Sequence, residues 1–209
     1  MERDLLMTGI GGQGIQLAAQ LLARAAIAEG REVQLFGSYG GMMRGGNTDT
    51  TLVIGDGPIE APPTTDRAWA AIVMHHEFAA PTLTRVRAGG LVFANTNLVA
   101  VPLELDGFDP PAEREALVVV GVPATDLAVD AGNILAAAMV MVGAFAAATG
   151  LVQVDALVAA VPDALPAYRH QHVALNQGAL TLGAAHAPVL ADEMTAWTPS
   201  TRAAAGGAR

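Results

Sequence analysis

The sequence contains no cysteine and no lysine, and it has few aromatic residues. Without cysteine, this chain can form no disulfide, no zinc–thiolate site and no iron–sulfur ligation. All eleven basic residues are arginine. The absence of lysine excludes Schiff-base chemistry and the P-loop of nucleoside triphosphatases, since that loop needs a lysine beside its glycines. Aromatic residues make up only 4% of the chain and apolar residues 52%, so we expect a core of alanine, valine and leucine.

Positive charge is also scarce. The formal net charge is -9, which argues against nucleic acid or an anionic membrane as a partner. Residues 131–154 carry no charge, but their most apolar part, residues 134–148, is about 22 Å long as a helix, whereas a bilayer core is about 30 Å thick. We therefore expect this helix to be buried in the protein core or in an interface. The polar first four residues do not look like a secretory signal peptide, and we expect a cytoplasmic protein.

A glycine-rich turn stands between the first predicted strand and the first predicted helix. Residues 5–8 are a short apolar run typical of a buried strand, and residues 15–28 have one apolar helix face. Between them, Gly9, Gly11 and Gly14 have the spacing G-x-G-x-x-G. Glycine lets backbone N–H groups approach a ligand closely, and a helix N-terminus attracts anions. The pattern predicts the first half of a Rossmann-like unit with an anion site.

One part of a dinucleotide site is missing from this pattern. Such a site usually has an acidic residue at the end of the second strand, where it holds the ribose hydroxyls. The second predicted strand, residues 33–36, is followed by Gly37, and Glu32 stands at its opposite end. The sequence therefore disfavours binding of NAD or FAD.

The rest of the chain predicts an α/β fold. We expect a Rossmann-like, mostly parallel sheet with helices on both faces, as a single domain (residues 1–186) with a helical C-terminal part, followed by an extended or flexible tail (residues 187–209). The further predicted strands are residues 48–54, 70–74, 91–94 and 117–120, with a turn at Gly89-Gly90, and the further predicted helices are residues 76–86, 123–131, 134–148, 153–161 and 166–183. We expect Asn133 to cap the long apolar helix.

A second glycine-rich loop, residues 39–47, follows the second predicted strand. In a parallel sheet this places it at the same carboxyl edge as the first glycine turn. Its only charged residue is Arg44, and a guanidinium among glycines suits a carboxylate or a phosphate. The alternative is that Arg44 pairs with an acidic residue inside the fold.

The two glycine motifs together resemble the gamma subunit of the 2-oxoacid:acceptor oxidoreductases, which include the pyruvate, 2-oxoglutarate and 2-ketoisovalerate:ferredoxin oxidoreductases. The resemblance runs over about residues 4–184. It rests on the following stretches: residues 9–14, residues 38–46, the β-rich residues 48–54, the glycine turn and strand 87–95, Gly132-Asn133 before the apolar helix, and Asn176 with Gly178.

The resemblance implies a heteromeric complex that converts a 2-oxoacid, CoA and an oxidised acceptor into acyl-CoA, CO₂ and the reduced acceptor. It implies alpha and beta subunits that hold thiamine diphosphate and Mg²⁺, and a ferredoxin-like subunit or ferredoxin associated with iron–sulfur clusters. The lack of cysteine agrees with this division of labour. Gly55-Asp56-Gly57 starts like a metal–diphosphate signature, but no pair of asparagines follows it, and we interpret it as a turn.

For this chain the resemblance implies assembly with the catalytic subunits, without catalytic or metal-binding residues of its own. A second role, a hypothesis that rests on the electrostatics of the helix N-terminus, is to hold part of coenzyme A at the two glycine loops. We place the CoA pyrophosphate at the N-terminus of the first helix, with Arg44 nearby. The predicted binding residues are Gly9, Gly11, Gly12, Gln13, Gly14, Tyr39, Arg44, Gly45, Gly46 and Asn95.

Two other readings of the whole chain stay open. The first is a stand-alone, Rossmann-like nucleotide-binding oxidoreductase, and the second is a scaffold module whose glycine turn binds no ligand. Among smaller signals, His75-His76-Glu77 looks like a metal cluster, but adjacent residues do not share a helix face, and we favour a capping or polar-edge role. We expect Tyr168, His170 and His172 to be solvated or at an interface.

Overall fold

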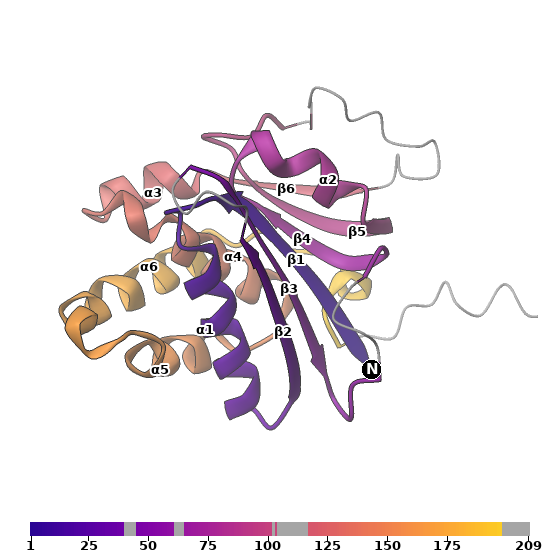
Figure 1. Ribbon diagram of the computed structural model, residues 1–209, viewed down its shortest axis with the longest axis horizontal. Helices are drawn as coiled ribbons and strands as arrows, with labels where there is room; N and C mark the ends of the chain where they lie inside the picture. Colours follow the sequence, from indigo (N-terminus) through magenta and orange to yellow (C-terminus); the bar gives the residue numbers. More distant parts are fainter. Residues whose placement is uncertain (40–44, 61–64, 102, 104–116, 198–209) are drawn as a thin grey trace, which may run out of the picture.

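The structure is a computed structural model that describes residues 1–39, 45–60, 65–101, 103 and 117–197. Figure 1 shows a single sheet flanked by helices. Its strands are β1 (Glu2–Ile10), β2 (Glu32–Tyr39), β3 (Asn47–Gly55), β4 (Ala68–Val73), β5 (Val86–Asn95) and β6 (Val118–Val122). Its helices are α1 (Ile15–Ala28), α2 (Ala79–Leu83), α3 (Ala124–Asp130), α4 (Ala137–Thr149), α5 (Val154–Ala164) and α6 (Val173–Ala185), and the 3₁₀ turns are η1 (His76–Phe78), η3 (Ile134–Ala136), η4 (Ala167–His172) and η5 (Asp192–Met194).

The sheet has the strand order β2-β3-β1-β4-β5-β6. Strands β1, β4, β5 and β6 pair in parallel, whereas β3 is antiparallel to both of its neighbours, β1 and β2. The predicted α/β fold with a mostly parallel sheet is confirmed. The position beside β1 is taken by β3, because β2 and β3 form a hairpin that turns back along β1. The start of β3 therefore lies at the carboxyl edge of β1, where Thr8 faces Asp49.

Helices cover both faces of the sheet, but unequally. The larger core lies between one face and helices α1, α3, α4, α5 and α6, and it includes Leu5, Met7 and Ile72 from the strands. The smaller core lies on the other face, where α2 packs against strand residues such as Leu6 and Val92. Strand β4 and the central part of β1 bury both of their faces, and their residues are mostly apolar, as the prediction of buried strands requires.

Helix α4 is buried on nearly all sides. It packs against α6 so closely that glycine is needed at the crossing: a Cβ on Gly143 would lie 2.1 Å from the backbone oxygen of Leu180, and one on Gly183 would lie 1.9 Å from that of Val140. The uncharged stretch is thus part of this chain's own core. Among the described residues, no helix is both long enough and apolar enough to cross a bilayer.

Two predicted boundaries were wrong. The helix expected over residues 76–86 ends at Leu83, and Val86 begins β5. The turn expected at Gly89-Gly90 lies inside β5, next to a register shift in its pairing with β4. A Cβ on Gly90 would lie 3.1 Å from the backbone oxygen of Trp69. This glycine therefore permits a close approach of two strands, a role that its sequence context does not distinguish from that of a turn.

Residues near the predicted tail are held against the domain. The Ala196 N–H donates to the backbone oxygen of Thr149 at 2.7 Å, and the indole N–H of Trp197 donates to that of Leu151 at 3.2 Å. The Arg31 guanidinium lies 3.6 Å from the centre of the Trp197 ring. Residues up to 197 are thus not a free tail, and the remainder, 198–209, lies outside the described residues.

Candidate functional site

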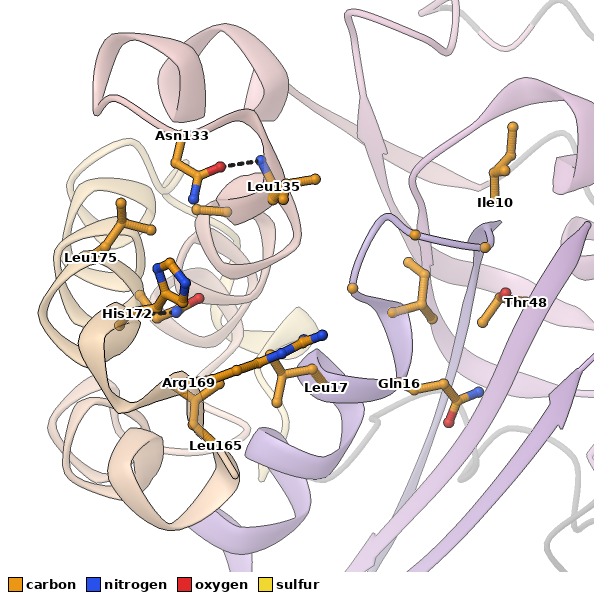
Figure 2. Close-up of a pocket in the computed structure, with 16 residues that line it drawn as sticks. Ile10, Gln16, Leu17, Thr48, Asn133, Leu135, Leu165, Arg169, His172 and Leu175 are labelled. Atoms are coloured by element: carbon orange, nitrogen blue, oxygen red, sulfur yellow. Dashed lines mark hydrogen bonds between the residues drawn. The ribbon is translucent and has the colours of Figure 1, made fainter. Parts of the chain in front are cut away.

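A cavity of about 550 Å³ opens at the carboxyl edge of β1, between the glycine turn and the C-terminal helices (Figure 2). One wall consists of the turn after β1 and the first turn of α1. The opposite wall comes from η3, η4 and the start of α6. The lining residues are Ile10, Gly11, Gly12, Gly14, Ile15, Gln16, Leu17, Thr48, Asn133, Leu135, Ala136, Leu165, Arg169, His172, Leu175 and Asn176.

The glycine turn places backbone N–H groups along this cavity. Gly12 and Gly14 have φ values of 109° and 83°, which residues other than glycine rarely adopt. Gly14 caps α1, and the first bond within the helix runs from the Ala18 N–H to the Gly14 oxygen at 2.9 Å. The N–H groups of the first turn have no partner within the helix, and no acidic side chain stands in that turn. This end of α1 therefore favours an anion.

The two glycine-rich loops meet, as their common sheet edge predicts. The Gly11 N–H donates to the backbone oxygen of Gly46 at 2.8 Å. Gly45 precedes it with a φ of 78°. Tyr39 is the last residue of β2, and Arg44 lies outside the described residues. The structure thus gives the second loop a backbone contact with the first.

Two of the predicted binding residues support the turn from behind. Gly9 is part of β1, and a Cβ there would lie 2.5 Å from the Gln13 side-chain oxygen. That oxygen accepts from the Ile10 N–H at 2.8 Å, while the Gln13 amide nitrogen donates to the Met74 oxygen at 3.4 Å. Of the predicted set, Gly11, Gly12 and Gly14 line the cavity, whereas Gly9 and Gln13 hold the turn in shape.

Asn95 does not line the cavity. It is fully buried at the end of β5, where its amide nitrogen donates to the Thr125 hydroxyl at 2.9 Å and its oxygen accepts from the Thr125 N–H at 3.3 Å. Asn97 adds a second acceptor for the same N–H at 3.0 Å. The two asparagines therefore anchor the start of α3 to the sheet.

Sequence reasoning missed the residues that form the other wall of the cavity. Asn133 was expected only as a cap, and its oxygen does accept from the Leu135 N–H at 2.9 Å, but both residues also line the cavity. Arg169 and His172 enter from η4. The one signal for Arg169 was its isolation, since no other basic residue except histidine occurs between Arg114 and Arg202.

The acidic residue missing from the end of β2 has a counterpart on β3. Asp49 lies at the same sheet edge, but its carboxylate accepts from the Thr8 hydroxyl and from the Asn47 amide, each at 2.6 Å. Its backbone oxygen accepts from the Gln16 side chain at 3.0 Å. The protein itself thus uses both carboxylate oxygens, which agrees with the prediction against a dinucleotide site.

The His75-His76-Glu77 sequence caps η1. The His75 ring nitrogen Nδ1 accepts from the Glu77 N–H at 3.2 Å, and the His75 and His76 rings stack with their centres 4.4 Å apart. The described part of the chain holds no group of three or more His, Cys, Asp or Glu placed to bind a metal ion. The predicted capping role is confirmed for His75.

We expect this cap to depend on pH. Burial, and then the neighbouring His76, lower the pKa of His75 below its ordinary value, while Glu77 opposes them. A lowered histidine pKa means that the unfolded chain binds the proton more readily, so the stabilisation is present above about pH 6.5 and is lost as the pH falls through the folded-state pKa. His75→Asn keeps a capping oxygen that does not titrate. Denaturation between about pH 7.5 and about pH 5.5 should show a smaller loss of stability for this variant; identical losses would contradict the assignment.

Comparison with known proteins agrees with this architecture. Residues 4–186 match the family model for pyruvate ferredoxin/flavodoxin oxidoreductase. The 2-oxoglutarate synthase subunit KorC of Methanothermobacter marburgensis is 30% identical over 168 residues, which cover 79% of this chain and 88% of that protein.

Solved structures share the fold. The gamma subunit of a keto/oxoacid ferredoxin oxidoreductase from Geobacter sulfurreducens PCA has a TM-score of 0.71 and 26% identity, over 88% of this chain and 98% of that one. A 2-oxoglutarate:ferredoxin oxidoreductase from Magnetococcus marinus, solved with 2-oxoglutarate, coenzyme A and succinyl-CoA bound, has a TM-score of 0.74 and 17% identity, over 95% of this chain and 34% of that one. The chain therefore belongs to the pyruvate ferredoxin/flavodoxin oxidoreductase family, as a gamma subunit of a 2-oxoacid:ferredoxin oxidoreductase.

Proposed function

We propose that this gamma subunit binds coenzyme A at the glycine turn and presents it to partner subunits that carry out the carbon chemistry. The partners are alpha and beta subunits, which hold thiamine diphosphate and Mg²⁺, and a ferredoxin-like subunit or ferredoxin, which is associated with iron–sulfur clusters. The complex oxidises a 2-oxoacid in the presence of CoA to acyl-CoA and CO₂ and reduces the acceptor. In this proposal the chain supplies a surface on which the partner subunits assemble, and it binds coenzyme A.

The observation that carries the proposal is the first turn of α1 facing the cavity. Gly12 and Gly14 keep that turn free of side chains that would cover its N–H groups. A diphosphate carries negative charge on acceptor oxygens, which is what a helix N-terminus and a glycine turn bind. The Magnetococcus marinus relative, which shares the fold, was solved with coenzyme A bound, and this makes CoA the diphosphate ligand to test first.

The remainder of the cavity suits the less polar part of such a ligand. Ile10, Leu135, Leu165 and Leu175 contribute apolar side chains to its walls. A site with a few polar groups on an apolar lining is the usual form of a pocket for small molecules. In this proposal the pantetheine arm leads from the diphosphate towards the partner subunits, since the chain itself lacks a thiamine signature.

The test is a Gly11→Asp gamma subunit within the assembled complex. A carboxylate at the turn repels a diphosphate and competes for the same N–H groups, so we expect the KM for CoA to rise about 10- to 100-fold. The KM for the 2-oxoacid should stay unchanged, because that substrate reacts on the partner subunits. Steady-state kinetics with each substrate varied in turn measures both values.

The matched control is Gly57→Asp. It adds the same charge, but Gly57 has open space around it, in the turn after the end of β3 that pairs with the start of β1, at the opposite edge of the sheet. This variant should keep the wild-type KM for CoA. A Gly11→Asp complex with an unchanged KM for CoA would falsify the proposed site.

A further inference from the structure

One polar side chain at the cavity has no hydrogen-bond partner. Thr48 is only 7% exposed, lines the cavity and stands opposite Gly9 in the β1–β3 ladder. The structure gives its hydroxyl no bond to any of the residues that it describes, and Figure 2 shows the side chain beside the glycine turn. Because the side chain lines the cavity, its hydroxyl is free to donate a hydrogen bond to a molecule bound there. Its position beside the α1 N-terminus therefore points to a ligand that accepts a hydrogen bond there.

The second feature is a cation on the opposite wall. Arg169 lines the cavity from η4, and its side chain extends across towards Leu17 in the first turn of α1 (Figure 2). Within the described ranges no carboxylate forms a salt bridge with it. Its guanidinium carbon lies 5.5 Å from the ring centre of the neighbouring Tyr168.

The 3₁₀ geometry of η4 gives Arg169 a companion. Residues three apart lie on the same side of a 3₁₀ helix, and His172, which also lines the cavity, follows Arg169 at that spacing. An imidazole N–H is a donor in either protonation state. In a chain with a net charge of -9, a cation and an imidazole turned to one cavity form a local site for negative charge.

We infer that Arg169 and Thr48 bind the diphosphate group of the ligand, from opposite walls, together with the first turn of α1. The inference rests on the proposed function and names the side chains that hold the ligand. A guanidinium can bind two phosphate oxygens at once, and it adds a full positive charge to the partial charge of the helix N-terminus. Arg169 thereby makes the cavity specific for a diphosphate ester and links η4 to α1 when the ligand is bound.

The experiment compares two probes on the full-length chain by titration calorimetry. CoA carries a diphosphate and a ribose phosphate, whereas dephospho-CoA carries the diphosphate alone. We expect Arg169→Gln to weaken binding of both probes by the same factor, about 10- to 100-fold, since a hydrogen-bonded charge is lost in both cases. Arg169→Lys, which keeps the charge but not the two-point contact, should give an intermediate loss.

Two further variants complete the design. Thr48→Val removes the hydroxyl at nearly constant shape and should weaken both probes about 2- to 10-fold. Arg24→Gln makes the same charge change as Arg169→Gln on an exposed part of α1 that does not line the cavity, and it should bind like the wild-type chain.

The outcomes separate the inference from the proposed function. If neither probe binds to the wild-type chain, the proposed function is overturned and this inference with it. Wild-type binding with no loss in Arg169→Gln would overturn the inference and leave the proposed function standing. A loss confined to CoA would place Arg169 on the ribose phosphate and overturn its assignment to the diphosphate.

Discussion

Replacing Gly183 by alanine is expected to lower the free energy of unfolding by about 3 kcal/mol or more. The added methyl group would lie 1.9 Å from the backbone oxygen of Val140, so α4 and α6 would have to separate. A flexible side chain could turn aside, but a helix backbone inside a packed core cannot move without disturbing its neighbours. Chemical denaturation followed by circular dichroism measures the loss.

The control for this variant lies in the same helix. Gly178 is in α6, and a Cβ there would meet nothing within 4 Å. Because alanine is the better helix former, Gly178→Ala should stabilise the protein by about 0.5–1 kcal/mol. A mild effect of Gly183→Ala would show that the two helices separate easily, which would contradict the close packing described above.

Replacing Phe145 by alanine should cost about 3–5 kcal/mol. Phe145 is completely buried in α4 and contacts two other aromatic rings edge to face, with centres 6.0 Å away for Trp69 and 5.1 Å away for Phe93. Few other aromatic side chains exist in a chain with 4% aromatic residues. The surrounding alanines and valines cannot fill the space that the lost ring leaves, so the cavity term should be large.

Phe36→Ala is the matched comparison. Phe36 lies on the edge strand β2 and is 51% exposed. Its replacement should change the free energy of unfolding by no more than about 0.5 kcal/mol. Similar losses in the two phenylalanine variants would mean that the ring cluster around Phe145 is not a principal source of stability.

The packing of α4 against α6 bears on the candidate site. The first turn of α6 contributes Leu175 and Asn176 to the cavity wall, and α4 follows directly on η3, which supplies Leu135. The close approach of α4 to α6 fixes these two elements relative to each other. A variant that loosens the pair should therefore also disturb the wall that faces the glycine turn.

The sequence alone determined the features that depend on neighbouring residues. The helix predicted over residues 15–28 agrees with α1 (Ile15–Ala28), because an apolar face, a preceding glycine turn and a following Gly30 are local signals. The cap by Asn133 and the α/β class were predicted for the same reason. The family resemblance rested on two glycine motifs, whose spacing is likewise visible along the chain.

Only the tertiary structure decided which distant residues meet. Strand β3 lies between β1 and β2 because hairpin pairing brings Thr48 beside Gly9, and no local pattern specifies that order. Arg169 and Leu17 line the same cavity although 152 positions separate them in the sequence, and the close contact of Gly143 and Gly183 with the facing helix is not visible in their sequence context. Asn95 looked like a pocket residue and is instead buried against Thr125. Such contacts depend on the packing of whole elements, whose free energy is distributed over many residues, so no short stretch of sequence reveals them.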